Sequence, residues 1–294
     1  MSERERKMDK HYYTPVEIIK ENINGAVTKA EKPRRQLFLL GIMAGAFIAL
    51  GGSASNVAVH SIANVGIARI VAGAIFPVGL MLIVFVGGEL FTGNCLITMA
   101  VLSKKTTWAK KIRNLFIVYF SNLLGALIID SLVFFSGQYN YSDGALGAYT
   151  IKVALGKVAI GPIEGVASGI LCNMLVCLAI LMAGASKDAG GKIWAIFFPI
   201  WAFVTAGFEH CIANMYYIPA GIMAATNPAY VAKAQELYGI TAQQCESLTV
   251  LSSLKNYIPV TIGNAIGGMA FIGAMYFYIF IYNTEVHEEL KENN

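Results

Sequence analysis

Charged residues are scarce in this sequence. Only 14% of its 294 residues are charged, whereas soluble domains carry roughly a quarter. Hydrophobic residues make up 56%, and the mean hydropathy is +0.59. Several stretches of about 20 residues are nearly free of charge, and a helix of that length spans the hydrocarbon core of a bilayer. The composition excludes a soluble domain and indicates a chain embedded in a lipid bilayer, without a nucleic-acid partner.

Enzyme motifs and paired cysteines are missing as well. None of the five cysteines forms a Cys-x-x-Cys pair, and most lie in apolar runs where a cysteine packs like a small apolar residue. The zinc-protease motif His-Glu-x-x-His is absent, and the run from Gly165 to Gly169 misses the serine-hydrolase pattern by one residue. We expect no metal, no cofactor and no enzymatic activity. Residues 1–35 lack the apolar core of a cleavable signal peptide.

Long apolar runs are abundant instead. Six of them are predicted to span the membrane, at about 36–57, 67–102, 112–136, 160–184, 192–224 and 256–282. The second and fifth are too long for one simple span and carry polar residues near the middle. Residues 137–159 and 225–255 are expected to be loops. The predicted regions are an N-terminal arm (1–35), a six-span channel domain (36–282) and an acidic tail (283–294).

The arm contains one predicted helix, at residues 14–31. Thr14, Pro15 and Glu17 fit a capping box with proline in the first turn. Apolar residues then recur at helical spacing, at Val16, Ile19, Ile23, Val27 and Ala30. Such an amphipathic helix is expected along the membrane interface or against a neighbouring subunit.

The distribution of lysine and arginine predicts the orientation. The arm holds nine, the 103–113 connection five, the 185–192 connection two and the tail one, so that 17 fall on one side against five in the rest of the chain. Positive residues gather on the cytoplasmic side of membrane proteins. We therefore expect a multi-pass protein of the cell membrane with both termini in the cytoplasm.

An internal repeat links the two overlong segments. Both contain Glu-x4-Asn, from Glu89 to Asn94 and from Glu209 to Asn214. Each is followed one segment later by Asn-x-x-Gly, at Asn122–Gly125 and Asn264–Gly267. Because three spans make up each half, the second copy must be inverted relative to the first. Inverted repeats of this kind bind solute near the bilayer midplane, between broken helices.

Two helix breaks favour an anionic solute. Glycines permit a sharp turn, and Glu89 with Asn94 can hydrogen-bond the exposed backbone at the first break. Glu209 and Asn214 can do the same at the second, and the free N-termini of half-helices carry partial positive charge. The alternative is that these four side chains only hold the fold. His210 adjoins the second break, and we expect it to face the pathway.

These residues resemble the signatures of a known family. The runs Gly87–Asn94 and Gly207–Met215, together with Asn256–Gly268, are similar to the formate/nitrite transporter family, and the resemblance extends from about residue 14 to residue 282. It implies an all-α membrane protein with a three-plus-three inverted repeat of six transmembrane helices, two of them broken, in an aquaporin-like arrangement. It also implies a homopentamer with one pore in each protomer, conducting formate, nitrite or hydrosulfide.

The resemblance assigns roles to particular residues. His210 and Thr92 match the family's pore centre, while Glu89 and Asn94 support the helix break. The apolar constrictions match Phe76, Leu80, Leu90 and Phe203, and the polar network and vestibule match Lys157, Asn173, Glu209 and Asn214. The pair Gly88–Glu89 departs from the Ala-Asp of some formate channels, so the choice among the three anions stays open. Passage as an ion and passage with a proton as a neutral acid also stay open.

Other functions remain as alternatives. Asn227-Pro228-Ala229 is the tripeptide of aquaporins, but a water channel needs two facing copies and this sequence has one, in a predicted external loop. An intramembrane enzyme around Glu209-His210 lacks further ligand-type residues nearby. A structural scaffold has no need of broken helices. A gas or ammonium channel also uses a pore histidine, and anion flux distinguishes it.

Overall fold

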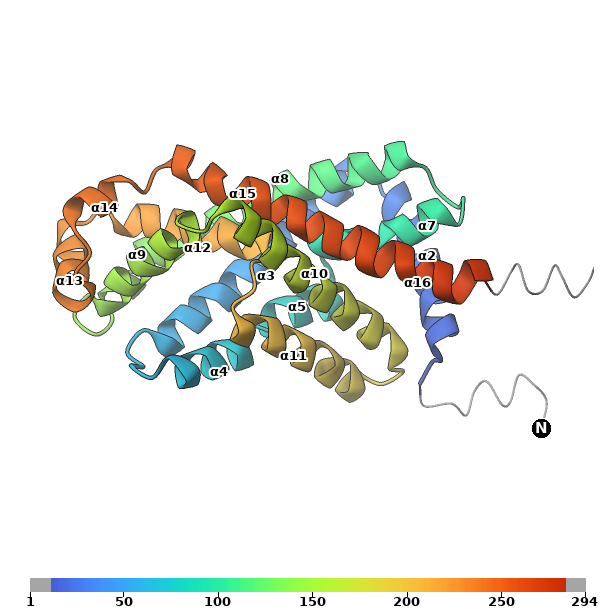
Figure 1. The fold of residues 1–294 in the computed structure, drawn as a ribbon, viewed down its shortest axis with the longest axis horizontal. Coiled ribbons are helices and arrows are strands. Elements are labelled where there is room, and N and C mark those ends of the chain that lie inside the picture. The colour runs from blue at the N-terminus through green and yellow to red at the C-terminus, as the bar shows by residue number, and fades with distance from the viewer. Residues whose placement is uncertain (1–11, 284–294) are drawn as a thin grey trace, which may run out of the picture.

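The computed structural model describes residues 12–283, whose regular elements are helices (Figure 1). Six helical stretches in this range are long and apolar enough to cross a bilayer. In chain order they are α3 (Arg34–Val59), α4 with α5 and η1 (Val65–Ile75, Val78–Leu82 and Ile83–Gly87), α8 (Trp108–Phe135), α10 (Pro162–Ala185), α11 (Ala189–Ala206), and α15 with η3, α16 and η4 (Val250–Ile266, Gly267–Ala274, Met275–Phe277 and Tyr278–Tyr282). The prediction of an all-α protein with six spans is confirmed.

Both overlong segments are broken, as the repeat predicts. In the second segment the helix ends at Gly87 and restarts as the short α6 (Phe91–Asn94), followed by α7 (Ile97–Leu102). In the fifth, α11 ends at Ala206 and α12 (Cys211–Ala224) begins four residues after Gly207. Gly87 and Gly207 have φ of +105° and +77°. Residues with a side chain rarely adopt this left-handed region, so glycine suits both turns.

Two pairs of closely packed helices surround the breaks. Helix α3 lies against α8, and α10 lies against α15. A β-carbon on Gly125 would collide with the backbone carbonyl of Ile42, and one on Gly267 would collide with that of Ile170. These glycines end the two Asn-x-x-Gly motifs. Their lack of a side chain lets each asparagine-bearing helix approach its partner closely enough for the asparagine to reach a break.

The arm helix packs on its own chain. Helix α2 (Pro15–Glu31) begins with the predicted capping box, in which the backbone N–H and the hydroxyl of Thr14 both donate to the Glu17 carboxylate at 2.8 Å. Its apolar face buries Ile19, Ile23 and Ala30 against α7, α8, α10 and η4. The apolar face is thus covered by the chain itself, and the position of the helix along the membrane interface or against a neighbouring subunit stays a prediction. Residues 1–11 of the predicted arm lie outside the described residues.

Both described ends of the chain lie at the same end of the molecule. In Figure 1 the start of α2 and the end of the last helix are on the right, with the connections α7–α8 and α10–α11. This agrees with an even number of spans. The prediction for the tail, residues 283–294, falls outside the described range except for Asn283.

The two predicted loops are wrong, because both contain helices. Helix α9 (Ala145–Val158) occupies most of residues 137–159, after the turn η2 (Gln138–Asn140), and α13 (Pro228–Tyr238) and α14 (Ala242–Glu246) occupy much of 225–255. Helix α9 packs against α12 and α13. Glycines and tyrosines in this stretch gave the appearance of a loop. Gly147 instead lets α9 rest against the ring of Tyr230.

Candidate pore centre between the two helix breaks

An asparagine from the following span holds the first break. The side-chain amide of Asn122 donates to the carbonyl oxygens of Gly41 (2.8 Å) and Glu89 (2.9 Å), and its oxygen accepts from the N–H of Phe91 (3.0 Å). Asn122 is fully buried. One side chain therefore satisfies backbone groups on both sides of the break, where unpaired groups would be costly in the membrane.

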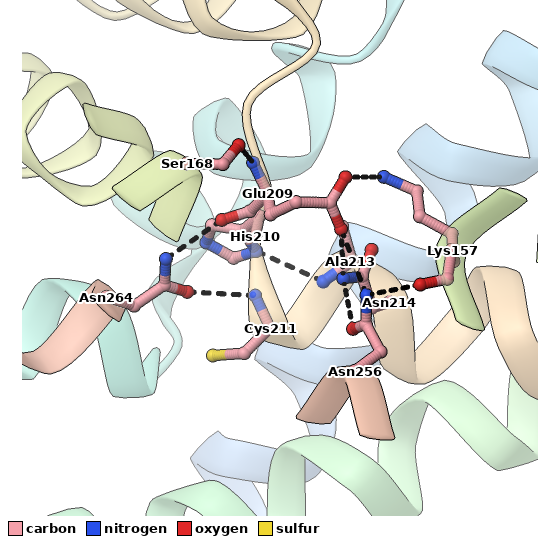
Figure 2. A network of polar contacts seen from close by, with 9 residues as sticks. All are labelled: Lys157, Ser168, Glu209, His210, Cys211, Ala213, Asn214, Asn256 and Asn264. Carbon is pink, nitrogen blue, oxygen red and sulfur yellow. Dashed lines mark hydrogen bonds and ion pairs between the residues drawn. The ribbon is translucent and has the colours of Figure 1, made fainter. Parts of the chain in front are cut away.

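The second break repeats this arrangement. The amide of Asn264 donates to the carbonyl of Glu209 (2.9 Å), and its oxygen accepts from the N–H of Cys211 at 2.8 Å (Figure 2). The same amide donates to the carbonyl of Gly169 at 2.8 Å. In addition, the N–H of Glu209 donates to the Ser168 hydroxyl at 3.0 Å. The Asn-x-x-Gly motifs are thus the supports of the breaks, which explains why they occur once in each half.

Each break also has a buried carboxylate that accepts from an asparagine, and that asparagine bonds to a second one. Asn94 donates to the Glu89 carboxylate at 2.7 Å and to the side-chain oxygen of Asn114 at 2.8 Å. In the second half, Asn214 donates to Glu209 at 2.7 Å and to Asn256 at 2.7 Å, as Figure 2 shows.

Lysines balance the two carboxylates from opposite ends of the molecule. Lys29 lies in the last turn of α2 and Lys32 directly follows that helix. Their Nζ atoms lie 3.2 Å and 3.4 Å from the carboxylate oxygens of Glu89. Lys157, near the end of α9, lies 2.6 Å from Glu209. Lys157 is a predicted site residue, whereas Lys29 and Lys32 are new.

His210 lies at the start of α12 and caps it. Its Nδ1 accepts a hydrogen bond from the N–H of Ala213 at 3.1 Å, so Nδ1 carries no proton in this geometry. The neutral ring then carries its proton on Nε2, which lies 3.0 Å from the hydroxyl oxygen of Thr92 and donates to it. The hydroxyl proton of Thr92 is left to be donated elsewhere. The predicted pair therefore forms one hydrogen-bonded unit that joins the two breaks.

Asn173 and Cys177 support Thr92 from behind. The amide of Asn173 donates to the carbonyl of Thr92 (3.3 Å) and to that of Asn264 (2.6 Å), and the thiol of Cys177 lies 3.6 Å from the Thr92 carbonyl. Both side chains are fully buried. Asn173 thus connects the first break to the helix that supports the second, and it lies at the pore centre rather than at the outer mouth.

The four predicted constriction residues are all buried. The ring of Phe203 meets that of Phe76 edge-on, with the ring centroids 5.7 Å apart. It also stacks on the imidazole of His210, with the centroids 6.0 Å apart. Leu80 and Leu90 belong to the same apolar cluster, each no more than 3% exposed. The four side chains therefore form one buried apolar barrier beside His210.

Two cavities lie in this part of the protein, one against the apolar barrier and one beside α2. The larger, about 960 Å³, reaches Phe76, Phe203 and His210 and contains Lys157. The smaller, about 290 Å³, lies beside α2 and is lined by Gly93 and Ile97. Leu80 and Leu90 line neither cavity. The larger cavity therefore reaches the apolar barrier at Phe76 and Phe203, next to His210.

Sequence reasoning missed several polar groups at the site. Asn114 and Asn256 lie in apolar spans as isolated amides, and only the parallel spacing from Asn122 and Asn264, eight residues later in each case, could have identified them. Arg69 and Lys152 face the larger cavity but lie outside the repeated motifs. Groups of three His, Cys, Asp or Glu side chains arranged to hold a metal ion are absent from residues 12–283.

Comparison with known proteins places the chain among transporters. Residues 16–278 match the model of a family described as formate/nitrite transporter. A probable formate transporter of Methanothermobacter thermautotrophicus is 35% identical over 292 residues, covering 93% of this chain and 99% of that protein. The formate channel FocA of Escherichia coli is 36% identical over 278 residues, covering 93% and 96%.

Solved structures agree with the sequence comparison. A pentameric formate channel with formate bound is 33% identical and superposes with a TM-score of 0.76, covering 84% of this chain and 98% of that one. An ion channel of the FNT family is 26% identical, with a TM-score of 0.75 over 90% and 98%.

Proposed function

The chain belongs to the formate/nitrite transporter family, and we propose that it is a channel for a small monovalent anion, with formate as the first candidate. The observation that carries this proposal is the His210–Thr92 hydrogen bond, buried beside an apolar cluster that contains Phe76, Leu80, Leu90 and Phe203. The pair offers hydrogen-bond donors at the one polar point of an apolar passage.

The proposed pathway begins in the larger cavity, here called the outer vestibule, which contains Lys157 and reaches His210. Lys157, together with Arg69 and Lys152, gives this cavity more positive charge than Glu209 balances, and this excess draws an anion toward the barrier. The constriction then strips the anion of water, which is costly for an ion by itself. The free hydroxyl proton of Thr92 offsets part of that cost by hydrogen-bonding the solute. The first turn of α12 contributes less than the sequence predicts, because two of its first three N–H groups already donate to Asn264 and His210.

Two modes of passage are compatible with this site. The solute crosses as an anion, or it gains a proton near His210 and crosses the apolar barrier as a neutral acid. The Ala213 N–H holds the ring in the neutral form, so protonation of Nδ1 requires that this hydrogen bond be broken. Nitrite and hydrosulfide are the alternative solutes, since each also has a neutral conjugate acid.

The assembly and topology complete the proposal. We propose a homopentamer in the cell membrane with both termini in the cytoplasm, an arm at residues 1–35, a channel domain at 36–282 and a tail at 283–294. The support is the resemblance to a solved pentameric channel, the location of both described chain ends at one end of the molecule, and the basic connections there. Labelling of cysteines introduced in the α7–α8 and α3–α4 connections, from each side of the membrane, tests the orientation.

A water channel is not favoured by the aquaporin-like tripeptide. Asn227 lies at the start of α13, and its side-chain oxygen accepts from the N–H of Ala229 at 3.0 Å. The tripeptide therefore caps a helix at the outer end of the molecule, away from both breaks.

The test is a flux panel in proteoliposomes. Formate, nitrite, hydrosulfide, lactate and water are compared at equal gradients, with empty liposomes and the His210→Asn variant as controls. Formate flux is expected to exceed the flux of water and lactate. Rapid water flux without flux of formate, nitrite or hydrosulfide would contradict the proposal.

A further inference from the structure

Arg69 is an unused cation in the wall of the outer vestibule. It lies on α4, exposed to the cavity that reaches His210, and Thr205 donates to its backbone carbonyl at 3.5 Å. Its guanidinium packs over Gly207, where a β-carbon would collide with one of its nitrogens. The positive charge is therefore held at the outer edge of the second break, two residues before Glu209.

The charges around this cavity leave Arg69 without a counterion. Three lysine and arginine side chains line it, and Glu209 is the one carboxylate among its lining residues. Glu209 is already paired with Lys157 at 2.6 Å. Among residues 12–283, carboxylate oxygens are absent from within 4.0 Å of the Arg69 guanidinium.

The other outer lysines contact carboxylates or an aromatic ring. Lys233, on α13, is paired with Asp143 at 3.2 Å and with Glu236 at 3.0 Å. Lys152 lies over the ring of Tyr238, 4.4 Å from its centre. Lys152 also lacks a carboxylate partner among the described residues, and Arg69 differs from it in offering a planar guanidinium held against the second break.

We infer that Arg69 forms an outer capture site for anions with two oxygens on one atom, which binds the solute before it enters the constriction. The inference rests on the proposed function and deepens it. A guanidinium offers two parallel N–H groups that match the two oxygens of a carboxylate or of nitrite, whereas an ammonium acts as a point charge. Hydrosulfide has one atom to accept these bonds, so the site selects formate and nitrite over hydrosulfide.

The test compares three substitutions at matched positions. Arg69→Gln removes the charge, Arg69→Lys keeps the charge without the two-pronged geometry, and Lys152→Gln removes a neighbouring vestibule charge. Uptake of formate and of hydrosulfide is measured against external concentration in cells that lack their own channel. The assembly of each variant is checked by size-exclusion chromatography.

The three variants are expected to separate the effect of the positive charge at Arg69 from the effect of the two parallel N–H groups of its guanidinium. Arg69→Gln raises the half-saturating concentration of formate about two- to fivefold, as the loss of an exposed charge pair allows. Arg69→Lys raises it for formate but not for hydrosulfide, and Lys152→Gln changes both anions alike. Equal effects of Arg69→Lys on the two anions, or no effect of Arg69→Gln on formate, would overturn the inference.

A binding experiment separates this inference from the proposed function. Purified protein in detergent is titrated calorimetrically with benzoate, a carboxylate too wide for the constriction but smaller than the vestibule. Wild-type binding that is lost in Arg69→Gln and weakened in Arg69→Lys supports the capture site even if formate flux is absent. Equal binding by all three proteins overturns it while leaving the channel proposal intact.

Discussion

The two helix breaks share their supports but differ in the residues that face the pathway. Asn122 and Asn264 make the same three hydrogen bonds, each to a break and to a neighbouring helix. At the position that caps the new half-helix, however, the first break has Leu90 and the second has His210. The repeat therefore preserves what the membrane demands of interrupted backbone, and the difference between its copies provides the chemistry.

The breaks also differ in the origin of their cations. Glu89 is balanced by two lysines of the arm helix, and Glu209 by the single Lys157 of α9. The first break is thus tied to the end of the molecule that carries the termini, and the second faces the outer vestibule. The predictions below run from the largest expected effect on stability to the smallest.

Replacing either supporting asparagine by leucine should be the most damaging change. Asn122→Leu and Asn264→Leu each remove three hydrogen bonds and leave two buried backbone groups at the break unpaired, at about 1–3 kcal/mol for each group. We expect each variant to lose about 3 kcal/mol or more and to fail to assemble, as measured by thermal unfolding and size-exclusion chromatography in detergent. Asn227→Ala, at an exposed helix start, is the control. Tolerance of one substitution but not the other would show that the two breaks are not held alike.

Truncation at the constrictions should cost less and open the path. Phe203→Ala removes contacts with Phe76 and His210, and Leu90→Ala removes a buried leucine, at about 2–4 kcal/mol in each case. Formate flux should rise, or lactate should begin to pass, in liposomes containing assembled protein. Wild-type rate and selectivity in both folded variants would remove these side chains from the pathway.

Loss of a lysine should destabilise the protein less at the first break than at the second, because two lysines balance Glu89 and one balances Glu209. Lys157→Gln leaves Glu209 buried without a counterion, and we expect a loss of about 1–3 kcal/mol. Lys29→Gln leaves Lys32 near Glu89, and Lys29 is itself 38% exposed, so its loss should stay below about 1 kcal/mol. Thermal unfolding of the two single variants and of Lys29→Gln/Lys32→Gln measures the difference. Equal losses for the two single variants would contradict the idea of redundancy.

Substitution of the pore histidine should leave stability almost unchanged and alter function most specifically. In His210→Asn the asparagine still caps α12, because its side-chain oxygen can accept from the Ala213 N–H. It cannot titrate in the physiological range, where an unperturbed histidine has a pKa of about 6.5. Formate flux measured against pH should therefore lose most of its pH dependence. An unchanged profile in a well-assembled variant would make His210 a structural residue only.

Much of the site could be predicted because the membrane imposes strict local rules. A glutamate with an asparagine five residues later, repeated in two apolar segments, is expensive in lipid unless it supports irregular backbone. That rule located both breaks and singled out His210 beside the second, and the resemblance added Thr92. The hydrogen bond between this pair required the structure, since 118 residues separate them in the chain.

Other parts of the site could not be predicted from local pattern. The glycines of residues 137–159 predict a loop, but the structure has helix α9 there. Gly147 serves close packing of this helix against the ring of Tyr230. Arg69 has the sequence context of an ordinary residue near the end of a span. Its role depends on Gly207, which is distant in the chain and leaves room for its guanidinium.

The sequence by itself determined the six spans, the inverted repeat, the two breaks and the side on which basic residues gather. These follow from segment length, hydropathy and the cost of unpaired polar groups in lipid, all of which act within a short stretch of chain. Only the tertiary structure decided which lysine balances which glutamate, which tautomer His210 adopts, and which vestibule cations lack a carboxylate partner. Those outcomes depend on distances of about 3 Å between groups far apart in the sequence, which are set when the two halves pack together.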